Sequence, residues 1–320
     1  MKVFLDGYIP DVLQAETAAR AGKPSDRERL LDLAAPWDWD PSAKIPPVSA
    51  WSDYSRWLEK KAISHTADAS FQWWKIPRAL DFFTPSQEQQ PNCAGFALAN
   101  AYTATLLHQI GGCWSEQLPA KINPMATWVM SKEGSDIGGQ TISAIALAGN
   151  AIGNYTVELA GEYDQQNRYR QWRNLTVEAS ERQIGVSLFD GEPEELPRAI
   201  LNAQKFGRAV IFGNSKAVSG THTDGNGVIC ATLGGSWSHA TCFAGYQRVN
   251  GTEYVYWLNS HGNIYATDGV TPAFGCWMDA ATLKRFCRSR FCDAAFLTYA
   301  EAPYCHDVEP TLNPNRPEVA

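Results

Sequence analysis

The stretch from Gln87 to Asn100, QEQQPNCAGFALAN, places a single cysteine where a polar segment changes into an apolar one. Pro91 lacks an amide donor and restricts the residue before it, so the polar lead-in cannot be helical far past this position. The small and apolar residues after Cys93 recur at helical spacing, and alanine is the best helix former. The sequence therefore predicts that Cys93 lies at, or just inside, the N-terminus of a buried helix.

A cysteine in this position has an electrostatic reason to be reactive. The first amides of a helix have no intrahelical acceptor, and the helix dipole is positive at this end. Both favour a thiolate, which is the nucleophilic form of cysteine. The plainer interpretation of Cys93 is a buried structural cysteine, because this residue type is among the most often buried.

Two downstream stretches favour the reactive interpretation. SWSHATCFAGY contains His239, YVYWLNSHG contains Asn259, and both stretches are predicted strands. A cysteine followed by a distant histidine and then an asparagine is the order of a nucleophile, its base and the residue that orients the base. Gln87, six residues before Cys93, carries an amide that can donate to an oxyanion.

In these residues the sequence resembles the papain-like (C1) cysteine peptidases. The resemblance implies an α+β fold with a helical left lobe, an antiparallel β-barrel-like right lobe and an active-site cleft between them. It implies thiol-dependent peptide-bond hydrolysis with Cys93 as nucleophile, His239 as base, Asn259 as orienter and Gln87 as oxyanion donor. Further matches to the family are Phe96, the His239-Ala240 pair, Gly245-Tyr246, and Asn259-Ser260 with Gly262.

The same resemblance implies where a substrate would bind. Gly138 and Gly139 precede a predicted helix, and in the family a Gly-Gly pair lines the cleft, where a residue without a side chain lets the substrate backbone approach. An ordinary turn at the start of a helix explains these glycines equally well. Ala240, directly after the predicted base, is assigned to substrate binding on the same ground.

Three departures from the family pattern are visible. The family's Gly-Ser-Cys-Trp core reads NCA around Cys93, and His261 stands where the family has a tryptophan that shields the Asn–His hydrogen bond from water. The pair of His239 and Asn259 is therefore expected to be less shielded. Gln90 replaces a family cysteine, so the family's first disulfide cannot form. These departures resemble divergent bacterial or phage members.

The chain is expected to divide into three parts. Residues 1–70 form an N-terminal extension, residues 71–300 the peptidase-like domain, and residues 301–320 an extended tail. Within the domain, the left lobe is expected to span about 71–190 and the right lobe about 191–300.

The extension has its own helical signals. Ser25 with Glu28 predicts a capping box, and Trp51, Tyr54 and Leu58 fall on one face of a second helix. Three interpretations stay open for this extension: packing on the body of the same protein, an inhibitory pro-segment, or an arm that docks on a partner.

The remaining expectations concern local structure. The sequence predicts helices in segments 123–132 and 192–206, and a short helix that closes segment 275–285. It predicts polar loops at 165–173 and 214–227, the latter with a solvated His222, and strands at 208–213, 228–231, 239–247, 254–259 and 294–299.

Composition narrows the class of protein and its partners. The formal net charge of −7 over 320 residues argues against a dedicated nucleic-acid binder. No apolar run approaches the length of a membrane span, and the N-terminus does not read as a signal peptide. The expected partner is a peptide or protein substrate, with no nucleic acid and no membrane. The expected location is cytoplasmic or virion-associated.

Eight cysteines are present, and without a signal peptide most are expected to be reduced. Four of them cluster towards the C-terminus, but their spacing is too loose for a zinc site: Cys276, Cys287, Cys292 and Cys305. Neither a metal nor a cofactor is expected.

Two other functions compete with the peptidase. One is a papain-like body that serves as a structural or docking part of a larger assembly, such as a phage virion, through the extension and the tail. The other is a peptidoglycan amidase or transglutaminase, which shares the Cys–His pair. The Gln six residues before the Cys and the Asn-Ser-x-Gly after the His favour the papain arrangement.

Overall fold

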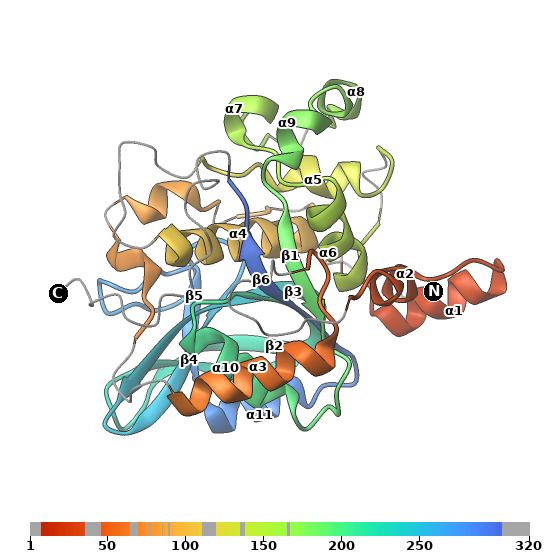
Figure 1. Ribbon diagram of the computed structural model, residues 1–320. Coiled ribbons are helices and arrows are strands. Elements are labelled where there is room, and N and C mark those ends of the chain that lie inside the picture. Colours follow the sequence, from red (N-terminus) through yellow and green to blue (C-terminus); the bar gives the residue numbers. More distant parts are fainter. Residues whose placement is uncertain are drawn as a thin grey trace.

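The fold is that of a computed structural model, which describes residues 8–35, 46–64, 70–76, 78–84, 86–88, 90–110, 120–134, 138–164 and 167–302. Figure 1 shows a curled sheet with one group of helices above it and a second group below it. The combination of a helical part with a half-barrel sheet agrees with the α+β, two-lobed expectation.

The sheet has six described strands in the order β1-β6-β2-β3-β4-β5. Neighbours in this order run antiparallel, and β3 also pairs with β5 in parallel at Cys230 and Trp277, which curls the sheet towards a barrel. The strands are β1 (Ile184–Leu188), β2 (Val210–Thr223), β3 (Ile229–Val249), β4 (Thr252–Leu258), β5 (Gly275–Asp279) and β6 (Cys292–Ala300).

Helices above the sheet centre on α4 (Cys93–Ile110), which lies against β3, β6 and β2. The others that belong to this lobe are α5 (Pro124–Met130), α6 (Ile142–Ala151), α7 (Val157–Ala160), α8 (Tyr169–Arg173) and α9 (Thr176–Ser180), with the 3-10 turns η1 (Trp73–Lys75) and η2 (Ala79–Phe82). Below the sheet lie α3 (Trp51–Ser64), α10 (Leu196–Lys205) and α11 (Ala280–Cys287).

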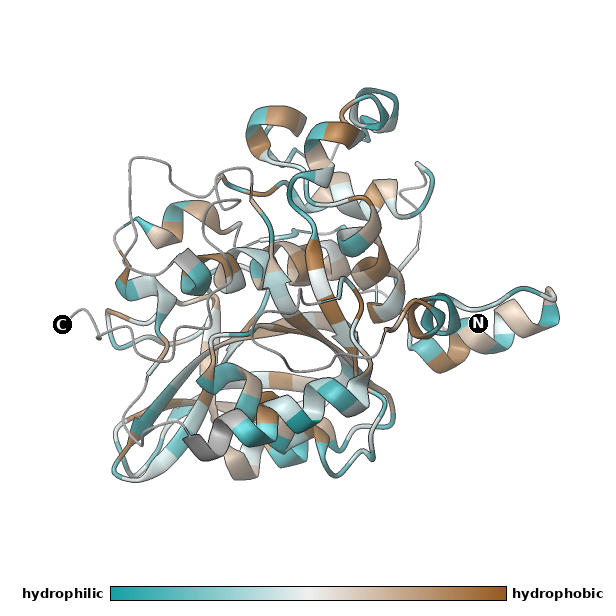
Figure 2. Cartoon of the chain, in the orientation of Figure 1, coloured by the Kyte–Doolittle hydropathy of each residue, from teal (hydrophilic) through white to brown (hydrophobic). Residues whose placement is uncertain are grey.

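The central strands are buried on both faces, which explains their near-continuous apolar sequence. On β2, Ile211 belongs to the core shared with α4, whereas Val210 and Phe212 belong to the core shared with α3, α10 and α11. Successive side chains of a strand point to opposite faces, so one strand supplies both cores. Figure 2 shows the hydrophilic residues of α3 and α10 on the side of these helices that faces the viewer.

The N-terminal extension is folded onto the rest of the chain. It contains α1 (Asp11–Arg20) and α2 (Asp26–Asp32), and the capping box predicted at Ser25 and Glu28 is confirmed. The predicted helix α3 is also confirmed. Its aromatic residues pack on the body of the same protein, with the Trp51 ring 4.8 Å from the ring of Phe189 and 4.9 Å from that of Phe296.

The prediction of a loop at 214–227 is wrong. β2 continues to Thr223, and the two strands predicted at 228–231 and 239–247 are one strand, β3, so the segment is a long hairpin. Its outer part is rich in Gly, Ser and Thr, a composition that is typical of loops. Cross-strand pairing holds it in place, including a 3.0 Å contact between His222 Nδ1 and Thr232 Oγ1, and His222 is exposed as expected.

The prediction of a loop at 165–173 is wrong for its second half, which forms α8. Trp172 is buried there and donates its indole N–H to the carbonyl oxygen of Ala160 at 3.1 Å. The burial of Trp172 therefore stabilises a helix in a segment whose polar composition predicts a loop. The strands β1 and β5 were not predicted, and α10 begins at Leu196 rather than at 192. The short helix expected at the end of segment 275–285 is α11, and the tail from residue 303 lies outside the described residues.

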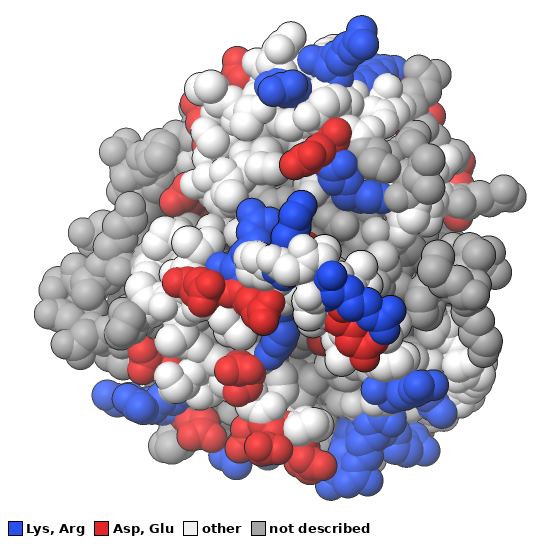
Figure 3. Space-filling view, turned by 90° about the vertical axis from the view of Figure 1, so that its right-hand side faces the viewer, with Lys and Arg blue, Asp and Glu red and all other residues white. Residues whose placement is uncertain are grey.

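Membrane-spanning helices, disulfides and metal-binding clusters are absent from the described residues. None of the described helices has the length and apolar character that crossing a membrane requires. In the same part of the chain there is no disulfide and no cluster of side chains suited to a metal ion, while Cys113 and Cys305 lie outside it. Figure 3 shows acidic and basic side chains interspersed on the face that includes the N-terminal helices.

We predict that Gly95→Ala destabilises the fold. A Cβ at Gly95 would lie 2.3 Å from the carbonyl oxygen of Pro124 and 2.8 Å from Cβ of Trp128, so α4 and α5 would have to separate. Overpacking of this kind costs roughly 1–3 kcal/mol, more than the gain of about 1 kcal/mol in helix propensity. The control is Gly220→Ala, where a Cβ meets no atom within 4 Å. Urea unfolding that shows Gly95→Ala to be as stable as wild type would contradict this packing.

Candidate active site

Cys93 is the first residue of α4, as predicted. The carbonyl oxygen of Asn92 accepts hydrogen bonds from the amides of Gly95 at 2.9 Å and Phe96 at 3.3 Å, which begins the helix at Cys93. The sulfur of Cys93 accepts the backbone N–H of Ala240 at 3.3 Å, and the residue is fully buried. A donor on the sulfur and the positive end of a helix both stabilise a thiolate.

His239 lies on β3, and Asn259 directly follows the neighbouring antiparallel strand β4. Nε2 of His239 lies 2.6 Å from Oδ1 of Asn259. The amide of Asn259 is oriented by Tyr265, whose hydroxyl accepts from Nδ2 at 2.8 Å, while the N–H of Ser260 donates to Oδ1 at 2.8 Å. An acceptor facing Nε2 makes Nε2 the protonated nitrogen, so Nδ1 is the ring nitrogen able to exchange a proton with a thiol.

The expectation that this pair is poorly shielded is wrong. His239 is 0% exposed and Asn259 is 1% exposed. The ring of His261, in the position of the family's tryptophan, stacks on His239 with 4.4 Å between centroids and 28° between planes. The ring of Trp237 contacts His239 at 4.7 Å and His261 at 5.9 Å. Two rings from this chain thus take over the protection that one tryptophan provides.

Gln87 lies beside the Asn259-Ser260 segment. Its backbone N–H donates to the carbonyl oxygen of Ser260 at 2.7 Å, and the hydroxyl of Ser260 donates to its side-chain oxygen. With the oxygen held in this way, the amide nitrogen points the other way and donates one hydrogen to the carbonyl oxygen of Gln90 at 2.8 Å. A primary amide has two hydrogens, so a second can be donated to a ligand.

Tyr163 contacts residues in the segment that leads to Cys93, and the sequence did not predict a role for this tyrosine. Its hydroxyl donates to the carbonyl oxygen of Gln87 at 3.0 Å and accepts from Nδ2 of Asn92 at 3.2 Å, and its ring contacts Phe96 edge-on at 5.1 Å. Burial raises the pKa of Tyr163 to about 12, so it is a neutral donor at physiological pH. A lone tyrosine near a polar segment offers no pattern from which this role could be recognised. Trp237 and Tyr265 were missed for the same reason.

The residues predicted to bind substrate come from two segments, residues 138–139 before α6 and Ala240 on β3. Ala240 contacts the thiol through its amide. Gly138 is exposed at φ +79°, a conformation that favours glycine, and its carbonyl oxygen accepts from Nζ of Lys132 at 3.0 Å. Gly139 follows it directly in the chain. Binding of substrate by these three residues stays a prediction.

The N-terminal extension reaches this region at Tyr8. Its backbone pairs with Gln140, directly after the two glycines, where the amide of Ile9 donates to the Gln140 carbonyl oxygen at 3.0 Å. On the other side, the hydroxyl of Ser238 donates to the carbonyl oxygen of Tyr8 at 2.8 Å. Tyr8 thus bridges the helical lobe and the residue before His239.

The ring of Tyr8 occupies a space that a glycine leaves open. A Cβ on Gly213 would lie 2.3 Å from this ring, and Gly213 is paired with Ala240 across β2 and β3. Tyr8 is fully buried. Its side chain therefore lies on the strand pair that also contacts the thiol of Cys93.

Several solved structures are similar to this chain. Xylellain, a cysteine protease from Xylella fastidiosa, is 16% identical, with 94% of this chain and 98% of that chain covered and a TM-score of 0.50. Digestive procathepsin L 3 of Tenebrio molitor larval midgut is 15% identical over 91% and 88% of the two chains, with a TM-score of 0.49. ProCathepsin B S9 from Trypanosoma congolense is 11% identical over 92% and 99%, with a TM-score of 0.48.

No protein-family model matches the sequence, and no curated protein sequence does. The structural likeness to xylellain extends over nearly the whole of both chains, whereas an identity of 16% is evidence for the fold alone. The fold expected from the motif residues is therefore confirmed: this chain has the fold of the papain-like cysteine proteases.

Proposed function

We propose that this protein hydrolyses peptide bonds with the thiol of Cys93. The observation that carries the proposal is the continuous set of contacts from Cys93 through the His239-Ala240 peptide to Asn259. It joins a thiol at a helix N-terminus to a histidine whose second nitrogen is already held by an amide oxygen. This is the arrangement of a thiol nucleophile, its base and the group that orients the base.

The reaction has two covalent steps. The Cys93 thiolate attacks the peptide carbonyl carbon, and the C–N bond breaks as the His239 imidazolium gives a proton to the leaving amine. In the second step a water attacks the thioester, and His239 takes a proton from that water. The thiolate leaves, the acyl group departs as a carboxylic acid, and the starting charges are restored.

Two donors are positioned for the oxyanion that forms in each step. One is the backbone N–H of Cys93, which lies in the first turn of α4, at the positive end of the helix dipole. The other is the remaining hydrogen of the Gln87 amide. Its neighbours Ser260 and Gln90 hold both ends of this amide, so the donor needs little reorganisation.

The N-terminal extension is proposed to be an inhibitory segment for this site. Tyr8 lies between Gln140 and Ser238, on the strands that hold the base, and Cys93 is fully buried. A substrate therefore needs this segment to move. The docking-arm and virion alternative gains no support from α3, whose aromatic face is used within the chain.

We predict that Cys93→Ala abolishes turnover and leaves the fold intact, because alanine is small and favours a helix. Since the N-terminal segment is proposed to cover the site, the reference for this assay is the Tyr8→Ala chain. The control is Cys242→Ala on β3, a buried thiol whose pKa is raised by burial. The measurements are release from a fluorogenic peptide mixture and the melting temperature. Turnover that persists without the Cys93 thiol would exclude this residue as the nucleophile.

We predict a graded loss for the base and its orienter, in the same Tyr8→Ala background. His239→Ala should lower kcat/KM by about 10³-fold or more, within the range for loss of general acid–base catalysis. Asn259→Ala should lower it by about 10–100-fold, as does loss of a partner that orients a functional histidine. A larger loss for Asn259→Ala than for His239→Ala would contradict these roles.

We predict that opening the N-terminal segment exposes Cys93 to alkylation. Limiting iodoacetamide at mildly acidic pH should label Cys93 about 100-fold faster in Tyr8→Ala than in wild type, since loss of a buried ring costs about 3 kcal/mol or more. Cys230 should react slowly, because burial above all raises its pKa to about 12. The control is Val12→Ala, which removes a half-exposed side chain from the same segment. Equal labelling in all three chains would show that Tyr8 does not cover the thiol.

A further inference from the structure

We propose that Asp11 and Asp293 form a proton-dependent latch, which holds the N-terminal segment against the candidate active site and loosens as the pH rises. The latch is a property of the described contacts. Its consequence for catalysis rests on the proposed peptidase function.

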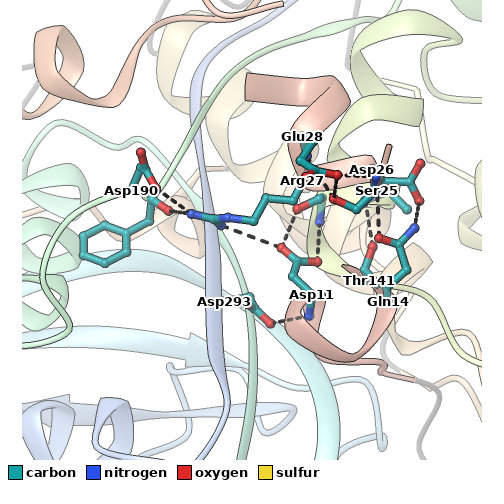
Figure 4. Close-up of polar contacts among 12 residues, drawn as sticks. Asp11, Gln14, Ser25, Asp26, Arg27, Glu28, Thr141, Asp190 and Asp293 are labelled. Atoms are coloured by element: carbon teal, nitrogen blue, oxygen red, sulfur yellow. Dashed lines mark hydrogen bonds and ion pairs between the residues drawn. The ribbon is translucent and has the colours of Figure 1, made fainter. Parts of the chain in front are cut away.

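The two carboxylates belong to parts of the chain that are far apart in sequence. Asp11 is the first residue of α1 and is 1% exposed, and Asp293 lies near the start of β6. The backbone N–H of Asp11 donates to Oδ2 of Asp293 at 3.0 Å, and the hydroxyl of Tyr8 donates to the same oxygen. Figure 4 shows the Asp11 and Asp293 side chains at this junction.

The carboxylate of Asp11 is also held from the helical lobe. Ser143 on α6 donates its backbone N–H to Oδ1 at 3.4 Å and its hydroxyl to Oδ2. The residues around Asp11 therefore fasten the extension to both lobes at once: to β6 through Asp293 and to α6 through Ser143.

The positive charge near this pair is shared. Arg27 on α2 approaches Asp11 at 3.9 Å, but its guanidinium also donates to Asp190 at 2.8 Å and to the Phe189 carbonyl oxygen at 3.0 Å. The other titratable groups facing the pair are the Tyr8 hydroxyl and the nearby Cys292 thiol, both neutral. Among the described residues this guanidinium thus contacts two carboxylates and one carbonyl oxygen, and of the two carboxylates it lies closer to Asp190, the more exposed one.

Burying two ionised carboxylates side by side is unfavourable, so one of them keeps a proton. Burial foremost, and then the charge of Asp293, raise the pKa of Asp11 to about 7, against smaller opposing effects of Ser143 and Arg27. Burial likewise raises the pKa of Asp293. The geometry and the pKa directions lead to the same conclusion.

The sign of the pH effect follows from linkage. A solvent-exposed aspartic acid has a pKa of about 3.9, so the segment takes up roughly one proton when it docks at intermediate pH. The stabilisation of the docked form is complete below about pH 4 and is lost as the pH rises towards 7. In this interval the opening equilibrium constant increases about tenfold for each pH unit.

Opening at this latch would release the residue that covers the site. Tyr8 is bound to Asp293 through its hydroxyl and to Ser238 through its carbonyl oxygen. Once the two carboxylates repel each other, the ring of Tyr8, which lies on Gly213, loses the hydrogen bond to Asp293 that holds it. The strand pair next to Cys93 then becomes accessible at neutral pH rather than at acidic pH.

The test measures hydrogen exchange of the amides of residues 8–20 between pH 5 and 7, in the full chain carrying Cys93→Ala. After correction for the intrinsic exchange rates, the opening constant should rise about 100-fold over these two pH units. Asp11→Asn keeps the size of the side chain but cannot ionise, so its opening constant should stay nearly flat. The control is Glu16→Gln, an exposed carboxylate on the same helix, which should keep the wild-type slope.

A flat wild-type profile, or a wild-type slope in Asp11→Asn, would overturn the latch. If Asp11→Asn does not fold, Asp293→Asn tests the same pair and should lower the slope without abolishing it, because burial still raises the pKa of Asp11. The measurement uses a chain without the nucleophile, so it does not depend on peptidase activity. Absence of turnover in the wild type would refute the proposed function and leave the exchange result standing.

Discussion

The hydrogen bond from the Ala240 amide to the Cys93 sulfur joins the two halves of this fold at the candidate site. One partner is the first residue of α4, and the other lies within β3. Neither position could shift alone, because α4 is packed closely on α5 at Gly95 and β3 is paired on both sides. The reactivity of the thiol therefore depends on how a helix from one lobe meets a strand from the other.

Around this contact, the polar residues form a connected set. Asn259 orients His239, Tyr265 and Ser260 orient Asn259, and Ser260 in turn holds Gln87. Each group is buried and each has its partner, which is how a polar network remains stable away from water. The stacked ring of His261 fits this set in a place where the family has tryptophan, so the departure seen in the sequence does not open the site.

The N-terminal extension adds a second polar set, and its charge balance differs. The carboxylates at Asp11 and Asp293 lie together inside the protein, and the guanidinium of Arg27 that approaches Asp11 is shared with Asp190. In the proposed latch, such an arrangement is more stable while one of the two carboxylates keeps a proton. The contact of the N-terminal segment with β6 can thus respond to pH without any change in the candidate active site.

Several features of this protein were determined by the sequence alone. The helix at Cys93 and the capping box at Ser25 follow from short-range chemistry: a proline before an alanine-rich run, and a serine three residues before a glutamate. The papain-like fold was implied by the resemblance of the motif residues, in their order along the chain, to a known family. The aromatic face of α3 was readable for the same reason, since side chains on one helical face share a partner.

Other features were decided only by tertiary structure. The long hairpin and α8 were misread because their polar composition is that of loops, and what orders them is pairing with a distant strand in one case and a buried Trp172 in the other. Tyr163, Tyr8 and Asp293 carry no periodic signal either. Each acts through a partner far away in the chain, and such contacts exist only after the lobes have packed, because the energy of a buried polar or charged group depends on what surrounds it.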